Sequence, residues 1–202
     1  LIGFSDITSL QWAIYARCGL PTISAGMVAT DMARDPMNRQ FEEYFWKFLE
    51  TGTITWPLDY EQNREETITG LCFSGTVSLA TKLLGSSYFP NTENSILVLE
   101  DVDEMTHKIE ANLLQCNLAG LFEKAKAVAL GRFRKAETEQ YPEVPPLDEV
   151  FKRVFQAYRK PLIHDVPYGH VDEKIPFPVG APISLYLGPE SYLESTESIF
   201  ED

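Results

Sequence analysis

The sequence predicts an α/β fold in which a mixed β-sheet is flanked by helices. Short runs rich in β-branched and aromatic residues, typical of strands, alternate with longer stretches in which apolar residues recur every three or four positions, typical of helices. Such alternation favours parallel pairing of at least some strands. The chain has 202 residues, of which 44% are hydrophobic, so it can bury a sizeable core.

The strongest helical pattern lies in the first quarter of the chain. It places Phe41, Phe45 and Phe48 on one face, after an expected cap at Asp35-Pro36 and before a terminating Gly52. An earlier helix is expected between Ser5 and Gly19, with Ile7, Leu10 and Ile14 on one face, and later helices within residues 75–84, 109–120 and 147–158. The polar, proline-rich residues 137–146 are expected to form a loop.

The strand signals include two continuous apolar runs, residues 95–99 and 125–130. Such runs are typical of strands that are covered on both faces. Shorter β-rich segments predict further strands at residues 53–56, 67–73, 162–165 and 183–187, and residues 1–3 are typical of the end of a strand.

Charge argues against some classes of partner, and the cysteines indicate the redox compartment. The chain has 17 Lys and Arg against 30 Asp and Glu, a net charge of −13, and no cationic stripe. An acidic surface of this kind argues against nucleic acid and against anionic membranes as partners. The odd number of well-separated cysteines, Cys18, Cys72 and Cys116, is typical of core residues in a reducing compartment.

The turn Gly3-Phe4-Ser5-Asp6, between a strand and a helix, is the first candidate site. A serine on such a turn can be raised above the sheet as a nucleophile, with backbone N–H groups at the start of the helix to hold an oxyanion. The simpler alternative is that Ser5 only caps the helix. The local sequence favours the cap.

Two further candidates are acids and a histidine. Glu100 and Asp101 follow a strand expected to be buried, where α/β folds often place their sites, although exposed acids at strand ends are equally common. His170 lies in a proline-framed loop and could act as a general base, although a lone loop histidine is usually a surface residue. His107 and His164 lack metal-ligand spacing, so no zinc site is expected.

Taken together, these segments resemble the signature blocks of the LD-carboxypeptidase family. The blocks are Gly-Phe-Ser-Asp-Ile-Thr, Ile-Leu-Val-Leu-Glu-Asp-Val-Asp-Glu, and Gly-His followed by Pro-Phe-Pro-Val-Gly. Their order and their intervals, 95 residues from Ser5 to Glu100 and 70 from Glu100 to His170, also suit the family. Further family-like segments at 41–49, 83–86, 109–120 and 127–133 extend the resemblance over nearly the whole chain.

The resemblance implies a serine hydrolase with a Ser-His-Glu triad. Ser5 would be the nucleophile, His170 the general base and acid, Glu100 the residue that orients the imidazole, and the backbone N–H of Asp6 an oxyanion donor. No metal ion or organic cofactor is implied. The family removes D-alanine from murein tetrapeptides in the cytoplasm during cell-wall recycling, and its members are commonly homodimers.

Two alternatives stay open. A related branch of the family cleaves a peptide-nucleotide antibiotic conjugate and so confers immunity, and a chain of this kind could also bind peptides without cleaving them. Two departures from the family pattern bear on this choice: Ser74-Gly75-Thr76 replaces Gly-Gly-Asn, and Ala25-Gly26-Met27 replaces Gly-Pro-Met. Both segments are expected near the site, which makes Ser74, Gly75 and Thr76 candidate substrate-binding residues.

The resemblance also implies that a portion of the enzyme precedes this chain. Residues 1–195 are expected to form the C-terminal catalytic part of the family's fold, followed by an acidic tail at 196–202, with the N-terminal domain largely missing. That domain includes a glycine-rich loop expected to complete the oxyanion hole. We therefore expect low activity from this chain alone.

Overall fold

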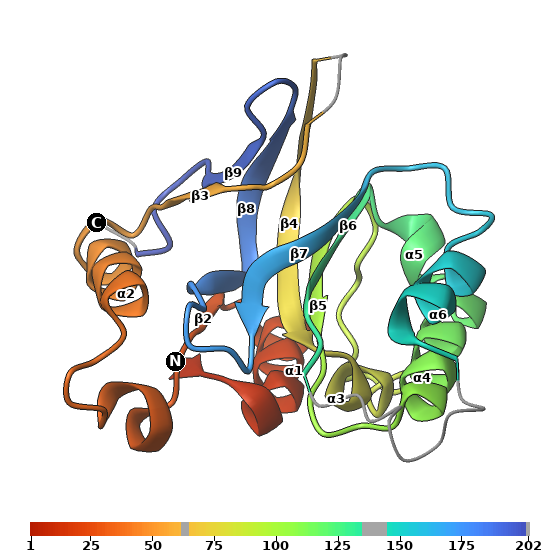
Figure 1. Cartoon of the computed structure of the whole chain (residues 1–202), viewed down its shortest axis with the longest axis horizontal. Coiled ribbons are helices and arrows are strands. Elements are labelled where there is room, and N and C mark those ends of the chain that lie inside the picture. Colours follow the sequence, from red (N-terminus) through yellow and green to blue (C-terminus); the bar gives the residue numbers. More distant parts are fainter. Residues whose placement is uncertain (62–64, 135–144, 201–202) are drawn as a thin grey trace.

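The computed structural model describes residues 1–61, 65–134 and 145–200, and it has a mixed sheet with helices packed against it (Figure 1). The strands of the sheet lie in the order β1-β2-β8-β4-β5-β6-β7, with β9 beside β8 and β3 beside β9. β4 to β7 are mutually parallel, whereas β8 runs antiparallel to both of its neighbours in this order. The predicted fold class is confirmed. The strands are β1 Ile2–Gly3, β2 Thr22–Ser24, β3 Thr55–Pro57, β4 Glu66–Thr76, β5 Ile96–Glu100, β6 Ala127–Arg132, β7 Leu162–Gly169, β8 Phe177–Leu187 and β9 Tyr192–Ser195.

The helices follow the strands in alternation over the middle of the chain. Figure 1 shows α4, α5 and α6 grouped beside β6, and α2 on the opposite side of the molecule. The helices are η1 Ser5–Ile7, α1 Thr8–Cys18, η2 Val28–Met32, α2 Arg39–Thr51, α3 Val77–Thr81, α4 Thr106–Leu118, α5 Leu121–Lys124 and α6 Leu147–Val154.

The central strand β5 divides the core into two parts. Ile96 and Val98 belong to one cluster of buried side chains, and Leu97 and Leu99 belong to the other. This alternation arises because successive side chains of a strand point to opposite faces of the sheet. α2 packs into the first cluster and α1, α3, α4, α5 and α6 into the second, so both faces of β5 are covered, as its continuous apolar sequence predicted.

One predicted helix is present but presents the opposite face to the core. In α1, the buried residues are Thr8, Gln11 and Trp12, while Leu10 is 49% exposed. The side-chain N–H donors on the buried side find acceptors: Gln11 Nε2 donates to the carbonyl of Ile23 at 2.7 Å, and Trp12 Nε1 donates to the carbonyl of Ser74 at 2.8 Å. Apolar periodicity alone could not reveal these distant acceptors.

The expected cap of α2 at Asp35-Pro36 is wrong. The helix begins after Asn38, whose side chain accepts the N–H of Phe41 at 3.1 Å, and the Asp35-Pro36 peptide bond is cis. Asn38 has the extended backbone and the short acceptor side chain that a cap requires. Gly52 ends the helix in a left-handed conformation, as predicted.

Other differences concern short segments. β2 and β9 were not predicted, because three or four residues carry too little pattern to be distinguished from a turn. The loop predicted at 137–146 lies mostly outside the described residues. Cys72 and Cys116 are buried as expected, whereas Cys18 is exposed at the end of α1.

Within the expected acidic tail, residues 196–200 are attached to the rest of the chain. Thr196 donates its backbone N–H to the carbonyl of Pro182 at 3.3 Å, and Ile199 donates to that of Gly52 at 3.0 Å. Among the helices in the described part of the chain, none combines the length and the apolar character needed to cross a membrane.

Two leucines of α4 test the assignment of its buried face. Leu113 is fully buried and Leu118 is 88% exposed. We expect Leu113→Ala to lower the free energy of unfolding by about 2–5 kcal/mol, because it removes buried methyl groups and leaves a cavity. The control, Leu118→Ala, should change it by less than about 0.5 kcal/mol. Urea denaturation of both variants makes the comparison, and equal losses would contradict the placement of α4.

Candidate active site

Ser5, His170 and Glu100 form a continuous hydrogen-bonded chain. Ser5 Oγ lies 3.0 Å from His170 Nε2, and His170 Nδ1 lies 2.8 Å from Glu100 Oε2. The three residues come from η1, from the loop after β7 and from the end of β5. This is the arrangement in which an imidazole can take a proton from a hydroxyl while a carboxylate fixes its orientation.

The backbone at Ser5 is in the left-handed region, with φ of 58°. A non-glycine residue in this conformation is strained, and such strain collects at functional sites. The preceding β1 runs directly into η1 and α1, so Ser5 occupies a sharp turn from strand to helix. Gly3 completes the turn, because a Cβ there would lie 2.3 Å from Cγ2 of Ile7. This geometry favours the nucleophile over the helix cap, since no side-chain cap hydrogen bond is present at either η1 or α1.

A glycine allows His170 to approach Glu100. Gly169 has φ of 134°, and a Cβ at this position would lie 2.7 Å from the carbonyl oxygen of Arg132 and 3.3 Å from Glu100 Oε2. Any residue other than glycine at this position would clash with Arg132 and push the His170 loop away from Glu100. The His170 side chain keeps 17% of its surface exposed, whereas that of Glu100 is fully buried.

The second carboxylate oxygen of Glu100 is held by Thr76. Thr76 Oγ1 donates to Glu100 Oε1 at 2.6 Å, and the backbone N–H of Thr76 donates to Thr8 Oγ1 at 3.1 Å. Ser74 is also buried and donates from Oγ to the carbonyl of Pro178 at 3.1 Å. A Cβ at Gly75 would contact Thr8 and Trp12. These three residues, expected to bind substrate, thus lie beneath the triad, and that role stays a prediction.

A cavity of about 640 Å³ opens beside Ser5. Its lining is mostly apolar and includes Met27 and Met32 on one side and Phe45, Trp46 and Leu49 of α2 on another. Asp6 also lines it, as an oxyanion donor next to Ser5 would require. The segment Ala25-Gly26-Met27, expected near the site, contributes Gly26 and Met27 to the wall.

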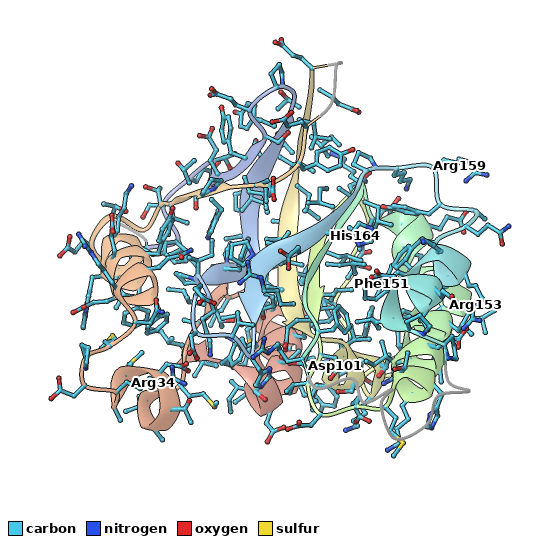
Figure 2. All side chains as sticks on the ribbon, viewed as in Figure 1. Arg34, Asp101, Phe151, Arg153, Arg159 and His164 are labelled. Carbon is cyan, nitrogen blue, oxygen red and sulfur yellow. The ribbon has the colours of Figure 1, made fainter. Side chains whose placement is uncertain are left out.

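The other two histidines are not part of this site. His164, labelled in Figure 2, packs against Phe151 with ring centroids 5.9 Å apart, and burial lowers its pKa. His107 lies on α4. Over residues 1–61, 65–134 and 145–200, no three His, Cys, Asp or Glu side chains lie close enough together to hold a metal ion.

Comparison with known proteins gives the family. The family model described as the LD-carboxypeptidase C-terminal domain matches residues 69–185, more than half of the chain. The chain belongs to the LD-carboxypeptidase family. The match includes Glu100 and His170, and Ser5 precedes it in the sequence.

Curated relatives match more of the chain than the family model does. The murein tetrapeptide carboxypeptidase of Pseudomonas aeruginosa is 29% identical over 191 residues, which cover 89% of this chain and 60% of that protein. A protein of Bacillus subtilis called a probable murein peptide carboxypeptidase is 24% identical, with 91% of this chain and 58% of that protein covered. The chain therefore spans about three-fifths of the length of the curated relatives it matches.

Solved structures share the fold. A muramoyltetrapeptide carboxypeptidase from Oxalobacter formigenes aligns with a TM-score of 0.87 at 21% identity, over 97% of this chain and 68% of that one. The microcin C7 self-immunity protein MccF, in complex with aspartyl sulfamoyl adenosine, aligns with a TM-score of 0.82 at 20% identity, over 99% of this chain and 68% of that one.

Asp101, next to Glu100, has a different environment. Its carboxylate accepts the backbone N–H of Ser78 at 2.9 Å, the hydroxyl of Ser78 at 3.0 Å and the N–H of Val102 at 3.0 Å. Figure 2 shows it at the lower end of β5, where α3 begins. Burial, with a smaller contribution from the Glu100 charge, raises the pKa of Asp101 to about 6 despite these hydrogen bonds. Asp101 thus fastens α3 to β5, and only Glu100 takes part in the triad.

The raised pKa of Asp101 predicts a pH dependence of stability. The folded state binds this proton more tightly than the unfolded chain, whose aspartate has a pKa near 3.8. Protonated Asp101 therefore contributes up to about 3 kcal/mol to the free energy of unfolding. This contribution is complete below about pH 4 and is lost as the pH rises through about 6. Asp101→Asn should remove this contribution to the pH slope, which urea denaturation from pH 4 to pH 7 measures.

Asparagine cannot accept from all three donors, so the variant should also be less stable at every pH. The difference in slope is the deciding quantity. Parallel curves for the two proteins would contradict the assignment.

Proposed function

We propose that this chain carries the catalytic machinery of a serine carboxypeptidase that cleaves the amide between an L-centre and a terminal D-amino acid. The hydrogen-bonded chain from Ser5 through His170 to Glu100 is the observation that carries the proposal. The substrate we propose is a murein tetrapeptide, from which D-alanine is released in cell-wall recycling in the cytoplasm. The curated relatives named for that activity support this choice.

Each step of the reaction uses a group described above. Ser5 Oγ attacks the carbonyl carbon of the scissile amide while His170 Nε2 takes the hydroxyl proton. Glu100 holds the ring through Nδ1–H and stabilises the imidazolium that forms. The N–H of Asp6 donates to the oxyanion, and His170 then returns its proton to the leaving amine. Water attacks the acyl-enzyme in the same way and releases the shortened peptide.

The composition of the cavity suits the uncharged parts of such a substrate. Its wall of Met27, Met32, Phe45 and Leu49 offers van der Waals contact rather than charge pairing. The rim includes Trp46, which is 49% exposed.

The second candidate function is cleavage of a peptide-nucleotide conjugate, as in the immunity branch of the family. The observation that favours it is the structural likeness to MccF in complex with aspartyl sulfamoyl adenosine. Relative turnover discriminates the two: faster cleavage of an aminoacyl-nucleotide conjugate than of a murein tetrapeptide would favour the immunity peptidase. Tight tetrapeptide binding without turnover would favour a non-catalytic binding module.

Replacement of the nucleophile tests the proposed reaction. We expect release of D-alanine from a murein tetrapeptide to fall at least a thousandfold in Ser5→Ala, because no acyl-enzyme can form. The assay uses this chain and the longest natural form of the protein that contains it. Ser9→Ala, in the first turn of α1, serves as the matched control and should retain activity. Equal release from Ser5→Ala would exclude Ser5 as the nucleophile.

Thr76 offers a finer test, because its hydroxyl donates to Glu100. Thr76→Val keeps the shape of the side chain but removes the hydroxyl that donates to Glu100 Oε1. Without this donor, Glu100 and the imidazole that it orients are held less firmly, so we expect kcat to fall roughly tenfold. Thr76→Ser keeps the donor and should retain most of the activity. Similar rates for the two variants would argue against a role for this hydrogen bond.

A further inference from the structure

A buried ion pair joins the wall of the cavity to the loop that carries His170. Lys174 Nζ lies 2.8 Å from Asp31 Oδ1, and the two side chains are only 5% and 8% exposed. Asp31 belongs to η2, and Lys174 follows His170 by four residues in the loop between β7 and β8. Burying two charges is unfavourable unless each is compensated, so stability alone does not explain a pair at this position.

Asp31 also organises the cavity wall on its own side. Its second oxygen, Oδ2, accepts the backbone N–H of Met27 at 2.7 Å and the hydroxyl of Thr30 at 3.1 Å. Burial tends to raise the pKa of Asp31, but the hydrogen bond from Lys174 and that from Met27 outweigh it and hold the pKa below the usual value. The carboxylate is therefore a charged anchor for the segment that contributes Met27, Val28 and Met32 to the cavity.

On the other side, Lys174 reaches the residue next to the nucleophile. Its Nζ lies 4.6 Å from the centroid of the Phe4 ring, a distance suited to a cation–π contact. The Phe4 ring in turn lies 4.7 Å, centroid to centroid, from the imidazole of His170. The Lys174 cation thus binds the cavity wall through Asp31 and packs on the ring of Phe4. Phe4 directly precedes Ser5 in the sequence, and its ring contacts the imidazole of His170.

We propose that Asp31 and Lys174 are positioning residues, which hold the His170 loop and Phe4 in register with the cavity wall so that Ser5 and His170 keep their hydrogen bond. The inference rests on the proposed function of Ser5 and His170. Neither residue touches the reacting atoms. Their effect is exerted through Phe4 and through the loop that Lys174 shares with His170.

A second ion pair joins the same two segments and provides a matched control. Arg34 Nη1 lies 2.7 Å from Asp172 Oδ1, but these side chains are 47% and 58% exposed. Figure 2 shows Arg34 at the edge of the molecule, at the end of the η2 segment. Solvent-exposed pairs contribute little, so removing this pair should leave the site unchanged.

The test compares Asp31→Asn/Lys174→Met with Arg34→Met/Asp172→Asn, both made in this chain. The first double variant removes both buried charges together, which avoids leaving one charge unpaired, and the amide oxygen introduced by Asp31→Asn can still accept from Met27. Two quantities are measured: the NMR signal of the His170 Nδ1–H proton, identified by its loss in His170→Gln, and the rate at which Ser5 reacts with a fluorophosphonate probe. Urea denaturation reports whether each variant is folded.

In the buried-pair variant we expect the His170 signal to shift or broaden and the rate of reaction with the probe to fall on the order of tenfold while the protein remains folded, because small displacements of reacting groups are costly. The exposed-pair variant should differ from the wild type by less than about twofold. A folded buried-pair variant with an unchanged signal and rate would overturn the proposal. It would then assign the pair to stability alone.

Asp31→Glu covers the case in which the double variant does not fold. It keeps both charges and moves the carboxylate by one methylene, so a shifted His170 signal supports the positioning role and an unchanged one counts against it. If the wild-type protein does not react with the probe even in its longest natural form, that result would count against the proposed function instead. The His170 signal requires no turnover, so it tests the ion pair independently.

Discussion

The Glu100 carboxylate is buried at the end of the central strand β5, and its hydrogen bonds determine where several segments must meet. A buried carboxylate is tolerated only when its oxygens have partners. One oxygen is bound by His170 and the other by Thr76, so the end of β4, the end of β5 and the loop after β7 converge on a single group. Geometry needed for catalysis and electrostatics needed for folding are therefore satisfied by the same contacts.

The parallel part of the sheet makes this convergence possible. β4, β5, β6 and β7 run in one direction, so their carboxyl ends lie at the same edge, where α/β folds place their sites. Close approach at this edge depends on glycine: a Cβ at Gly131 would lie 2.4 Å from the carbonyl of Tyr168, and one at Gly169 would meet Arg132. The nucleophile joins from a separate short strand, β1, which pairs with β2 at the other end of the sheet order.

The sequence predicted those features that depend on neighbouring residues, and it missed those that depend on contacts between residues far apart in the chain. The buried strand at 95–99 and the end of α2 at Gly52 depend on adjacent residues, and both were predicted. Ser5, Glu100 and His170 were weak candidates singly and became specific only through the order of the family blocks. The donor role of Thr76 and the pairing of Asp31 with Lys174 could not be predicted, because they join residues 24 and 143 positions apart. The buried face of α1 was missed for the same reason, since Gln11 and Trp12 depend on distant carbonyls.

The left-handed backbone at Ser5 has a consequence for how such a chain can change over time. A side chain at φ of 58° costs on the order of 1–3 kcal/mol, a cost that glycine would avoid. Selection for stability alone would thus replace Ser5 by glycine and, in doing so, discard the nucleophile. A serine at this position therefore lowers the stability of the fold but provides the nucleophile. A lineage that no longer needs catalysis would be expected to lose this serine early.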